Sequence, residues 1–326
     1  MKILVTGATG FIGSHLVPAL IKRGHKVRCL VRKTSDISKL KKLKNVEFFY
    51  GDITERRTLR RINEDIEAVF SVAGLLGKWG RTDRDLASVN VIGVKNLLAI
   101  FKETKLKKFI HFSAGGVTGP IRHGLADESY PCFPSTPYER TKYEGEKLAL
   151  KLGKRYRIPV VVVRPTFTYG PDDLHKLALF KLIKKGFFVF INNGKSLIHP
   201  VYIDDLIEGT LLALTKGKPG EVYIIGGKKP VSKKEFVLTI AKYLDINLRY
   251  VYVPFVLANL ATVLLEIIAQ ILRFEPPLTR SKVSMMGNNW GYNIKKAKGE
   301  LGYQPKIPIR VGIRRTITWY KKHNLL

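Results

Sequence analysis

A chain of 326 residues, 45% of them hydrophobic, is long enough for about two globular domains, and its composition excludes a disordered or fibrous protein. Its two cysteines, Cys29 and Cys132, lie far apart and outside any metal-binding spacing, so neither a disulfide scaffold nor a metal site is expected. The formal net charge is +31, from 57 lysines and arginines against 26 aspartates and glutamates.

The basic residues are scattered through every segment, and no basic stretch is interleaved with aromatic residues. Nucleic acid is the partner that such basicity suggests first, but we favour solvated surface charge that attracts anionic ligands, and we expect no nucleic-acid binding. Contact with an acidic membrane surface stays open. Because Met1 runs directly into a predicted strand, we expect no signal peptide and a reduced, cytoplasmic setting.

The first thirteen residues are the most informative stretch. Residues 3–5 form a short apolar run that is typical of a buried strand. Gly7, Gly10 and Gly13 follow at every third position, and apolar residues then recur at helical spacing. A dinucleotide pyrophosphate can rest on a helix N-terminus at such a turn, because the first N–H groups are unpaired and glycine lets phosphates approach the backbone. The spacing departs from G-x-G-x-x-G, and glycines alone also fit an ordinary turn.

The remainder of the first half alternates between strands and helices. We predict strands at residues 27–31, 46–50, 68–72, 109–112 and 160–163, and helices at residues 83–103 and 138–155. The last of these strands is apolar throughout, as expected of a parallel strand covered on both faces. The series predicts an α/β fold built on a Rossmann-like, doubly wound parallel sheet.

After Pro165 the alternation loosens. We predict a helix at 204–214, a strand at 221–225, and a helix that is capped by Ser232 and runs to Tyr243. Residues 255–274 are mostly apolar, but Glu266 near their middle would be costly inside a bilayer. We favour a helix packed in the core or between domains. The wall of an apolar substrate pocket and interfacial membrane contact are the alternatives.

Tyr138 and Lys142 lie four residues apart on a predicted helix and so share one face. A tyrosine hydroxyl is a poor base at neutral pH, because its free pKa is about 10, and a nearby ammonium lowers that pKa. The pair can therefore exchange a proton with an alcohol while a nicotinamide carries the hydride. Taken alone, Tyr-x-x-x-Lys is also a common accident on a solvated helix.

A set of motifs in fixed order makes the interpretation specific. They are Thr6-Gly7-Ala8-Thr9-Gly10-Phe11-Ile12-Gly13, Gly51-Asp52-Ile53, Val69-Phe70-Ser71-Val72-Ala73-Gly74, Asn90-Val91-Ile92-Gly93, Tyr138-Glu139-Arg140-Thr141-Lys142, Arg164-Pro165, Val201-Tyr202-Ile203-Asp204-Asp205 and Leu301-Gly302-Tyr303-Gln304-Pro305. Over nearly its whole length the chain resembles the extended short-chain dehydrogenase/reductase family, also called the NAD(P)-dependent epimerase/dehydratase family. Within that family, its sequence most resembles the branch of 3β-hydroxysteroid dehydrogenases and dihydroflavonol reductases.

The resemblance implies a Rossmann domain at residues 1–172 and a smaller, mainly substrate-binding region at 173–326, of which about 197–226 returns to the core sheet. It implies Tyr138 as the general acid/base and Lys142 as its activator and ribose ligand. The cofactor contacts it implies are Gly7, Thr9, Gly10, Phe11, Ile12, Gly13, Asp52, Ile53, Ala73, Pro165 and the Tyr138/Lys142 pair. Family members often dimerise through the helices that hold residues 90–101 and 138–155, so we expect a homodimer.

One position departs from the family pattern. The Ser or Thr that the family uses to hold the substrate oxygen falls on Ala114, which cannot donate a hydrogen bond. Ser113 is one residue early, and neighbouring strand residues face opposite ways. Ser113 serves after a one-residue shift, or Thr118 or a water substitutes, or turnover is slow. We assign the role to Ser113, although a structural serine fits equally well.

Cofactor choice depends on the end of the second strand. NAD enzymes place an acidic residue there for the ribose 2′-OH, whereas an arginine accommodates the 2′-phosphate of NADP. Here Val31 stands at that position, Arg32 and Lys33 follow, and Asp36 is too far along. We therefore predict NADP, with NAD as the alternative. Arg32 and Lys33 also fit ordinary solvated charges.

The leading hypothesis is an oxidoreductase that interconverts a secondary alcohol and a ketone. Leu75-Leu76 and the run at 255–274 favour an apolar substrate, and Trp79 either covers it or packs its own loop. The alternatives are a nucleotide-sugar epimerase or dehydratase with retained cofactor, and a catalytically weak cofactor-binding sensor or assembly protein. His199 fits a pocket lining or, as we prefer, a structural role.

Overall fold

Seven parallel strands form the central sheet of the computed structural model, which describes residues 1–276 and 278–326. In spatial order the strands are β11 (Val222–Ile225), β6 (Val160–Pro165), β5 (Lys108–Phe112), β4 (Ala68–Ser71), β1 (Lys2–Thr6), β2 (Lys26–Val31) and β3 (Val46–Tyr50). Strand order reverses between β1 and β4, which puts the topological switch point at the glycine turn. The expected Rossmann-like sheet is confirmed, and β11 joins it from the second half of the chain.

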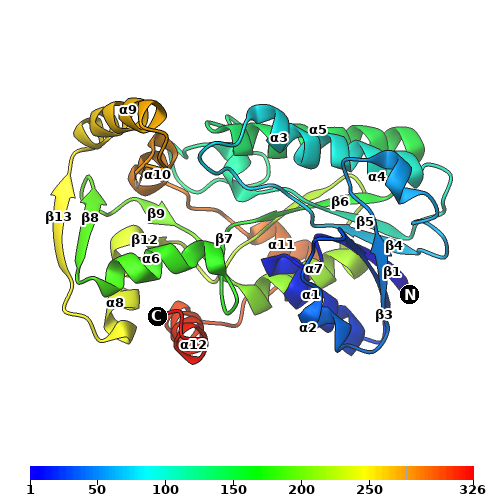
Figure 1. Ribbon diagram of the computed structural model, residues 1–326. Helices are drawn as coiled ribbons and strands as arrows, with labels where there is room; N and C mark the ends of the chain where they lie inside the picture. The colour runs from blue at the N-terminus through cyan, green and yellow to red at the C-terminus, as the bar shows by residue number, and fades with distance from the viewer. Residues whose placement is uncertain (277) are drawn as a thin grey trace.

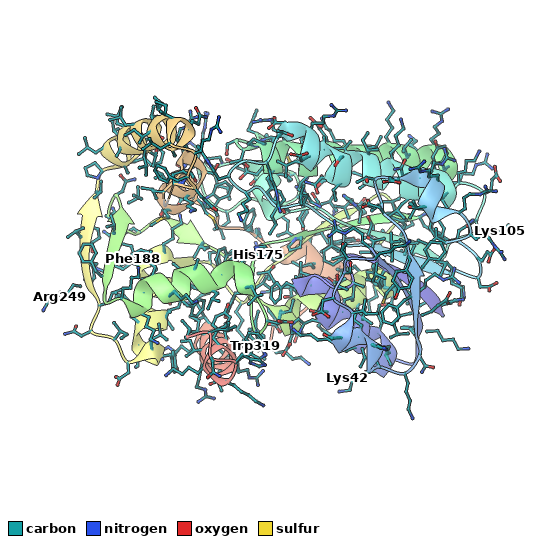
Figure 2. All side chains as sticks on the ribbon, viewed as in Figure 1. Lys42, Lys105, His175, Phe188, Arg249 and Trp319 are labelled. Atoms are coloured by element: carbon teal, nitrogen blue, oxygen red, sulfur yellow. The ribbon has the colours of Figure 1, made fainter. Side chains whose placement is uncertain are left out.

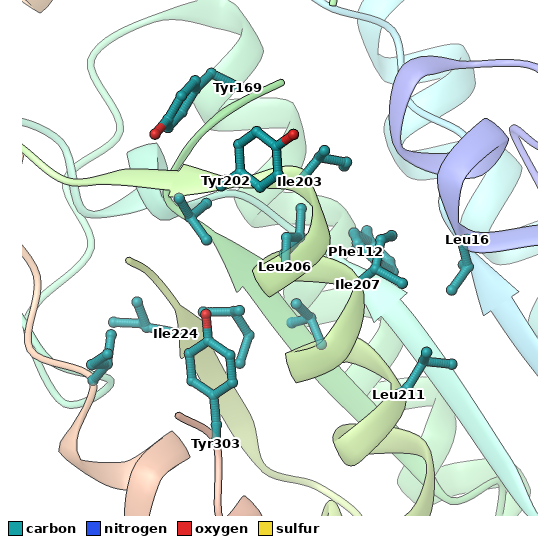
Figure 3. Close-up of a cluster of buried hydrophobic side chains, with 14 of the residues drawn as sticks. Leu16, Phe112, Tyr169, Tyr202, Ile203, Leu206, Ile207, Leu211, Ile224 and Tyr303 are labelled. Carbon is teal, nitrogen blue, oxygen red and sulfur yellow. The ribbon is translucent and has the colours of Figure 1, made fainter. Parts of the chain in front are cut away.

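Both faces of the sheet are buried, as the apolar strands require. Along β1, Ile3 and Val5 belong to one hydrophobic cluster and Leu4 to the other, because successive side chains point to opposite faces. Figure 3 shows part of the first cluster, in which Leu206 and Ile207 lie near Phe112 and Ile224. This double burial fixes each strand in register and leaves the carboxyl edge of the sheet free to hold a ligand.

Helices cover the two faces (Figure 1). On one face lie α3 (Asp83–Ala87), α4 (Gly93–Ile100) and α5 (Pro137–Tyr156), and on the other α1 (Phe11–Lys22), α2 (Ser38–Lys41), α7 (Ile203–Lys216) and α11 (Lys295–Leu301). Short 3-10 turns occupy Arg56–Leu59 and Gly115–Thr118. The start of α5 is set locally, because Thr136 and Glu139 form a capping box around Pro137.

The helix expected at residues 83–103 is confirmed from Asp83 to Ile100, but it is not a regular α-helix throughout. The segment divides into α3, a π-helical turn at Ser88–Ile92 and α4, and α4 ends at Ile100. A π turn inserts an extra residue into a helix and is frequent at functional sites. Here it brings the Asn90 carbonyl so close to α5 that a Cβ on Gly145 would lie 2.1 Å from that oxygen.

A second, smaller lobe follows the sheet. It contains α6 (Leu174–Lys184), β8 (Phe187–Ile191), α8 (Lys233–Leu244), β13 (Arg249–Val253), α9 (Phe255–Ile271), α10 (Arg280–Gly287) and α12 (Ile309–Lys322). Three two-stranded pairings complete it: β7 (Phe167–Tyr169) with β10 (Pro200–Tyr202), β9 (Leu197–Ile198) with β12 (Val231–Ser232), and β8 with β13. The predicted Ser232 cap is confirmed, since its hydroxyl accepts a hydrogen bond from the Glu235 N–H.

Helix α9 contradicts the preferred interpretation of residues 255–274 as a core or interdomain helix. Its buried residues are the small Ala258, Thr262 and Ala269, whereas most of its large aliphatic residues are exposed. Among the described residues, no helix is long and apolar enough to cross a membrane. The sequence pattern located the helix but not the side on which its apolar residues lie.

Basic side chains extend from every side of the molecule. Figure 2 labels Lys105, Lys42 and Arg249 near different edges, and all three are exposed. This distribution agrees with solvated surface charge rather than one basic groove.

Candidate functional site

The turn between β1 and α1 can be built only from glycine at two positions. Gly7 has φ +66°, in the left-handed region, and a Cβ there would lie 2.8 Å from the Ala73 Cα. A Cβ on Gly13 would lie 2.1 Å from the Gly7 carbonyl oxygen. The backbone of α1 therefore closes directly onto the end of β1, and Ala73 at the end of β4 closes the other side.

The start of α1 is open to an anionic ligand. Gly10 is the N-cap and supplies no side-chain cap, and the first turn carries no acidic residue. The first N–H groups of a helix have no partner within it, and the helix dipole is positive there. Thr9 and Gly10 are exposed, Phe11 and Ile12 are half-buried, and Gly13 is buried. This open cradle fits a dinucleotide pyrophosphate.

Lys142 reaches from α5 to the same edge of the sheet. Its ammonium donates a 2.5 Å hydrogen bond to the Phe112 carbonyl at the end of β5. A Cβ on Gly74, the residue after Ala73, would lie 3.7 Å from the Lys142 Nζ. The ammonium thus lies beside the segment that packs on Gly7, so the structure brings Lys142 and the glycine turn together.

Tyr138 lies one turn earlier on α5 and borders the same loop. Its Cβ is 3.3 Å from the position of a Cβ on Gly77. The side chain is half-buried, and its hydroxyl forms no hydrogen bond with the described residues. Tyr138, through its Cβ, and Lys142, through its ammonium, therefore both border the loop that follows β4.

The expected lowering of the Tyr138 pKa by Lys142 is wrong for this arrangement. Desolvation, with a further contribution from the charge of Glu139, raises the pKa of Tyr138 to about 12. Desolvation also lowers the pKa of Lys142 to about 8, although Glu146 opposes this shift. At neutral pH the tyrosine therefore carries its proton and can donate it.

The segment after β5 distinguishes Ser113 from Thr118, the two side-chain candidates for holding the substrate oxygen. Ser113 is buried, its hydroxyl has no partner among the described residues, and strand alternation puts it on the face of His111, toward α5. Ala114 is half-buried in extended backbone. The Thr118 hydroxyl already lies within hydrogen-bond distance of the Gly115 and Gly119 carbonyls. Of the two hydroxyls, only that of Ser113 is uncommitted.

The other predicted cofactor residues lie at the carboxyl ends of neighbouring strands. After β3, the Asp52 carboxylate accepts hydrogen bonds from the N–H and hydroxyl of Thr54, and Ile53 is buried against Gly93. Pro165 ends β6 and is half-buried. After β2, Arg32 and Lys33 are exposed, and neither forms an ion pair with the residues that the structure describes.

Sequence reasoning missed two residues that shape this edge. Asn90, in the π turn, accepts a hydrogen bond from the Leu75 N–H and donates to the Leu75 carbonyl and the Thr141 hydroxyl. Tyr292 from the C-terminal lobe lies against Gly115, where a Cβ would be 3.3 Å from its hydroxyl oxygen. The Asn90 motif was visible in the sequence, but nothing local assigned its partner.

His199 is 1% exposed, and one ring nitrogen lies 2.9 Å from the Gly227 carbonyl. It therefore packs in the interior beside Tyr292, with which it stacks.

A separate hollow of about 620 Å³ is lined by residues such as Lys2, Lys26 and Val46 at the amino ends of β1, β2 and β3. It lies at the opposite edge of the sheet from the glycine turn.

Comparisons with known proteins agree with this arrangement. The model of the NAD dependent epimerase/dehydratase family matches residues 3–226. The chain is 30% identical over 320 residues to 4-hydroxy-2-methyl-3-oxo-4-farnesyl-3,4-dihydroquinoline-1-oxide ketoreductase of Stigmatella aurantiaca, covering 96% of this chain and 95% of that protein. It is 32% identical over 236 residues to sterol demethylase protein B of Methylococcus capsulatus, and this alignment covers 70% of this chain and 70% of that protein. The crystal structure of UDP-glucuronic acid 4-epimerase from Bacillus cereus with NAD superimposes with a TM-score of 0.79 at 28% identity, over 99% of both chains.

We expect Asn90→Leu to loosen the loop after β4. Leucine keeps the volume but leaves the N–H and carbonyl of Leu75 without their partner, which costs about 1–3 kcal/mol of unfolding free energy. Hydrogen exchange should accelerate in residues 73–80. The matched control is Asn96→Leu, which removes hydrogen bonds to the Ile53 and Thr54 carbonyls and should affect residues 52–55 instead. Equal exchange at 73–80 in both variants would contradict the assignment.

Proposed function

The chain belongs to the NAD-dependent epimerase/dehydratase family, and on that premise we propose that it reduces an apolar ketone to a secondary alcohol, and reverses this reaction, with NADP(H) as hydride carrier. It is an NAD(P)-dependent enzyme of the oxidoreductase and epimerase type. The identity of the proton donor, the preferred dinucleotide and the class of substrate are the proposed parts.

The observation that carries the proposal is the position of α5 relative to the glycine turn. Tyr138 and Lys142 lie one turn apart on α5, and the Tyr138 Cβ and the Lys142 ammonium both border the loop that packs, through Ala73, on Gly7. When bound, the nicotinamide dinucleotide supplies or accepts the hydride. Lys142 holds positive charge at the carboxyl edge of the sheet, where the ribose would lie, and Tyr138 holds the proton that the new alcohol oxygen receives.

Ser113 is proposed to hold the substrate oxygen beside Tyr138. Its buried hydroxyl is without a partner and lies on the α5 side of β5, whereas the Thr118 hydroxyl is committed to its own turn. A fixed donor at this oxygen stabilises the charge that develops on it during hydride transfer. This assignment makes Ala114 a position that the reaction does not need.

Two features support an apolar substrate. The loop beside Tyr138 carries Leu75, Leu76 and the half-buried Trp79. The names of two relatives specify a farnesyl-bearing ketone and a sterol. A nucleotide-sugar epimerase or dehydratase with retained cofactor is the second candidate, favoured by the likeness to UDP-glucuronic acid 4-epimerase.

The end of β2 supports NADP. The usual acidic residue is replaced by Val31, and the exposed Arg32 is free to pair with a 2′-phosphate. The nearest carboxylate in sequence, Asp36, instead accepts a hydrogen bond from the Ser38 N–H.

Tyr138→Phe tests the proposal directly. We expect ketone reduction, followed as NADPH consumption, to fall by a factor of about 10² to 10⁴, because the variant lacks the donated proton. Folding should not change, since the hydroxyl bonds to no described residue. Tyr156→Phe, at the far end of α5, is the control and should keep full turnover. Product formed without net cofactor consumption would favour the epimerase. An unmodified protein inactive on a broad ketone panel would favour a non-catalytic role.

Cofactor preference is tested by affinity. We expect NADPH to bind about tenfold or more tightly than NADH, because an arginine–phosphate hydrogen bond contributes about 1.5–3 kcal/mol. Arg32→Asp should abolish that preference. Arg249→Asp makes the same charge change at the far edge of the smaller lobe (Figure 2) and should preserve it. Tighter NADH binding by the unmodified protein would refute the assignment.

The rate of reduction should depend on pH through Lys142. Reduction needs the protonated phenol, whose pKa is about 12, and the ammonium, whose pKa is about 8. As pH rises through about 8 the ammonium loses its charge while Tyr138 stays protonated, so reduction should decline. Alcohol oxidation should rise with pH, because it needs the phenolate. A reduction rate that stays level from about pH 7 to 10 would contradict this protonation scheme.

A further inference from the structure

Helix α9 carries its large apolar side chains on the outside of the molecule. The exposed residues are Val256, Leu257, Leu260, Leu264, Ile267, Ile268 and Ile271, each at least 47% exposed, and we call this set the α9 face. At 3.6 residues per turn they fall within roughly 120° around the helix. The side turned inward presents Ala258, Thr262 and Ala269. An ordinary surface helix has the opposite arrangement.

The α9 face continues beyond the helix and is larger than scattered surface hydrophobics explain. Leu272 is 67% exposed and Phe274 is 38% exposed directly after the helix. Contiguous apolar surface of this kind marks an interaction site. In Figure 1, α9 forms the outer edge of the smaller lobe, against α10 and away from the sheet.

Charge around the α9 face selects the partner. Residues 249–282 contain four basic residues, Arg249, Arg273, Arg280 and Lys282, and two acidic ones, Glu266 and Glu275. Both carboxylates are paired, Glu266 with Arg280 and Glu275 with Lys78. Within the described residues of this stretch neither carboxylate is left uncompensated, and the whole chain carries +31. The α9 face therefore attracts an anionic surface more than the same basic face of a second copy.

We propose that the α9 face docks onto an anionic lipid bilayer, with α9 lying in the plane of the interface. The helix has 17 residues and is about 25 Å long, which is less than the bilayer's hydrocarbon core of about 30 Å. A helix of this length with one exposed apolar stripe is suited to lie in the membrane interface and not to span the bilayer.

Docking also orients the rest of the molecule. The Lys78–Glu275 ion pair, 3.8 Å long, joins the loop after β4 to the segment after α9. The loop that borders Tyr138 is therefore joined to the segment that directly follows α9. The docking itself does not depend on the proposed reaction, because lipid binding is measured without turnover.

The test is co-sedimentation of the full chain with vesicles. We expect binding to vesicles of phosphatidylcholine mixed with phosphatidylglycerol, and weaker binding to phosphatidylcholine alone or at high salt. The double variant Leu260→Glu/Leu264→Glu should lower the partition coefficient by roughly 100-fold, because two leucines no longer enter the lipid and two carboxylates are repelled. The matched control, Leu174→Glu/Leu182→Glu, alters two comparably exposed leucines of α6 and should bind as the unmodified protein does.

Circular dichroism and melting temperature check that both variants fold, as expected for exposed positions. Absence of binding by the unmodified protein to the phosphatidylglycerol vesicles overturns the proposal, and so does equal loss in both double variants. Light scattering without lipid provides a separate result. If the α9 variant changes a dimer to a monomer while the α6 variant does not, the face is covered by a second copy and the lipid proposal is wrong.

Discussion

The close approach of three backbone segments at the switch point is the constraint on which the rest of this structure depends. Gly7, Gly13 and Ala73 touch without room for a Cβ between the two glycines. This contact aims the open N-terminus of α1 at the space above β1 and β4, and it fixes the start of the loop that follows β4. The positions of the residues that border that loop, Tyr138 and Lys142, depend on this contact.

Helix α5 is held against the sheet by groups that are costly to bury unless they are paired. Arg164 on β6 donates two hydrogen bonds to the Glu146 carboxylate, and both side chains are buried. Removing one partner of such a pair typically costs about 3–5 kcal/mol, because the other charge stays buried. Glu146 lies one turn after Lys142, so the pair fixes the rotation of α5 that directs Lys142 to the Phe112 carbonyl.

Burial at this edge also decides the protonation chemistry. Desolvation raises the pKa of Tyr138 and lowers the pKa of Lys142. At neutral pH Tyr138 therefore keeps its proton, as the proposed reduction requires. The same molecule displays a helix whose apolar residues face outward, and the Lys78–Glu275 ion pair joins the segment after that helix to the loop beside Tyr138.

Local sequence patterns were sufficient for the parts of the protein that depend on neighbours in the chain. Apolar runs located the sheet strands, Ser232 located a helix start, and the spacing of Tyr138 and Lys142 put them on one face. Glycine spacing together with the strand and helix around it located the turn between β1 and α1, and the order of the motifs indicated the family.

What only the tertiary structure decided depends on residues far apart in sequence. The hydrogen bonds of Asn90 in the π turn reach Leu75 and Thr141. The Ser113 hydroxyl has no partner because of the packing around it, and desolvation by surrounding residues raises the pKa of Tyr138. The outward turn of α9 is the clearest case. Periodicity shows that a helix has an apolar side, but only the partner against which it packs determines whether that side faces the protein or the solvent.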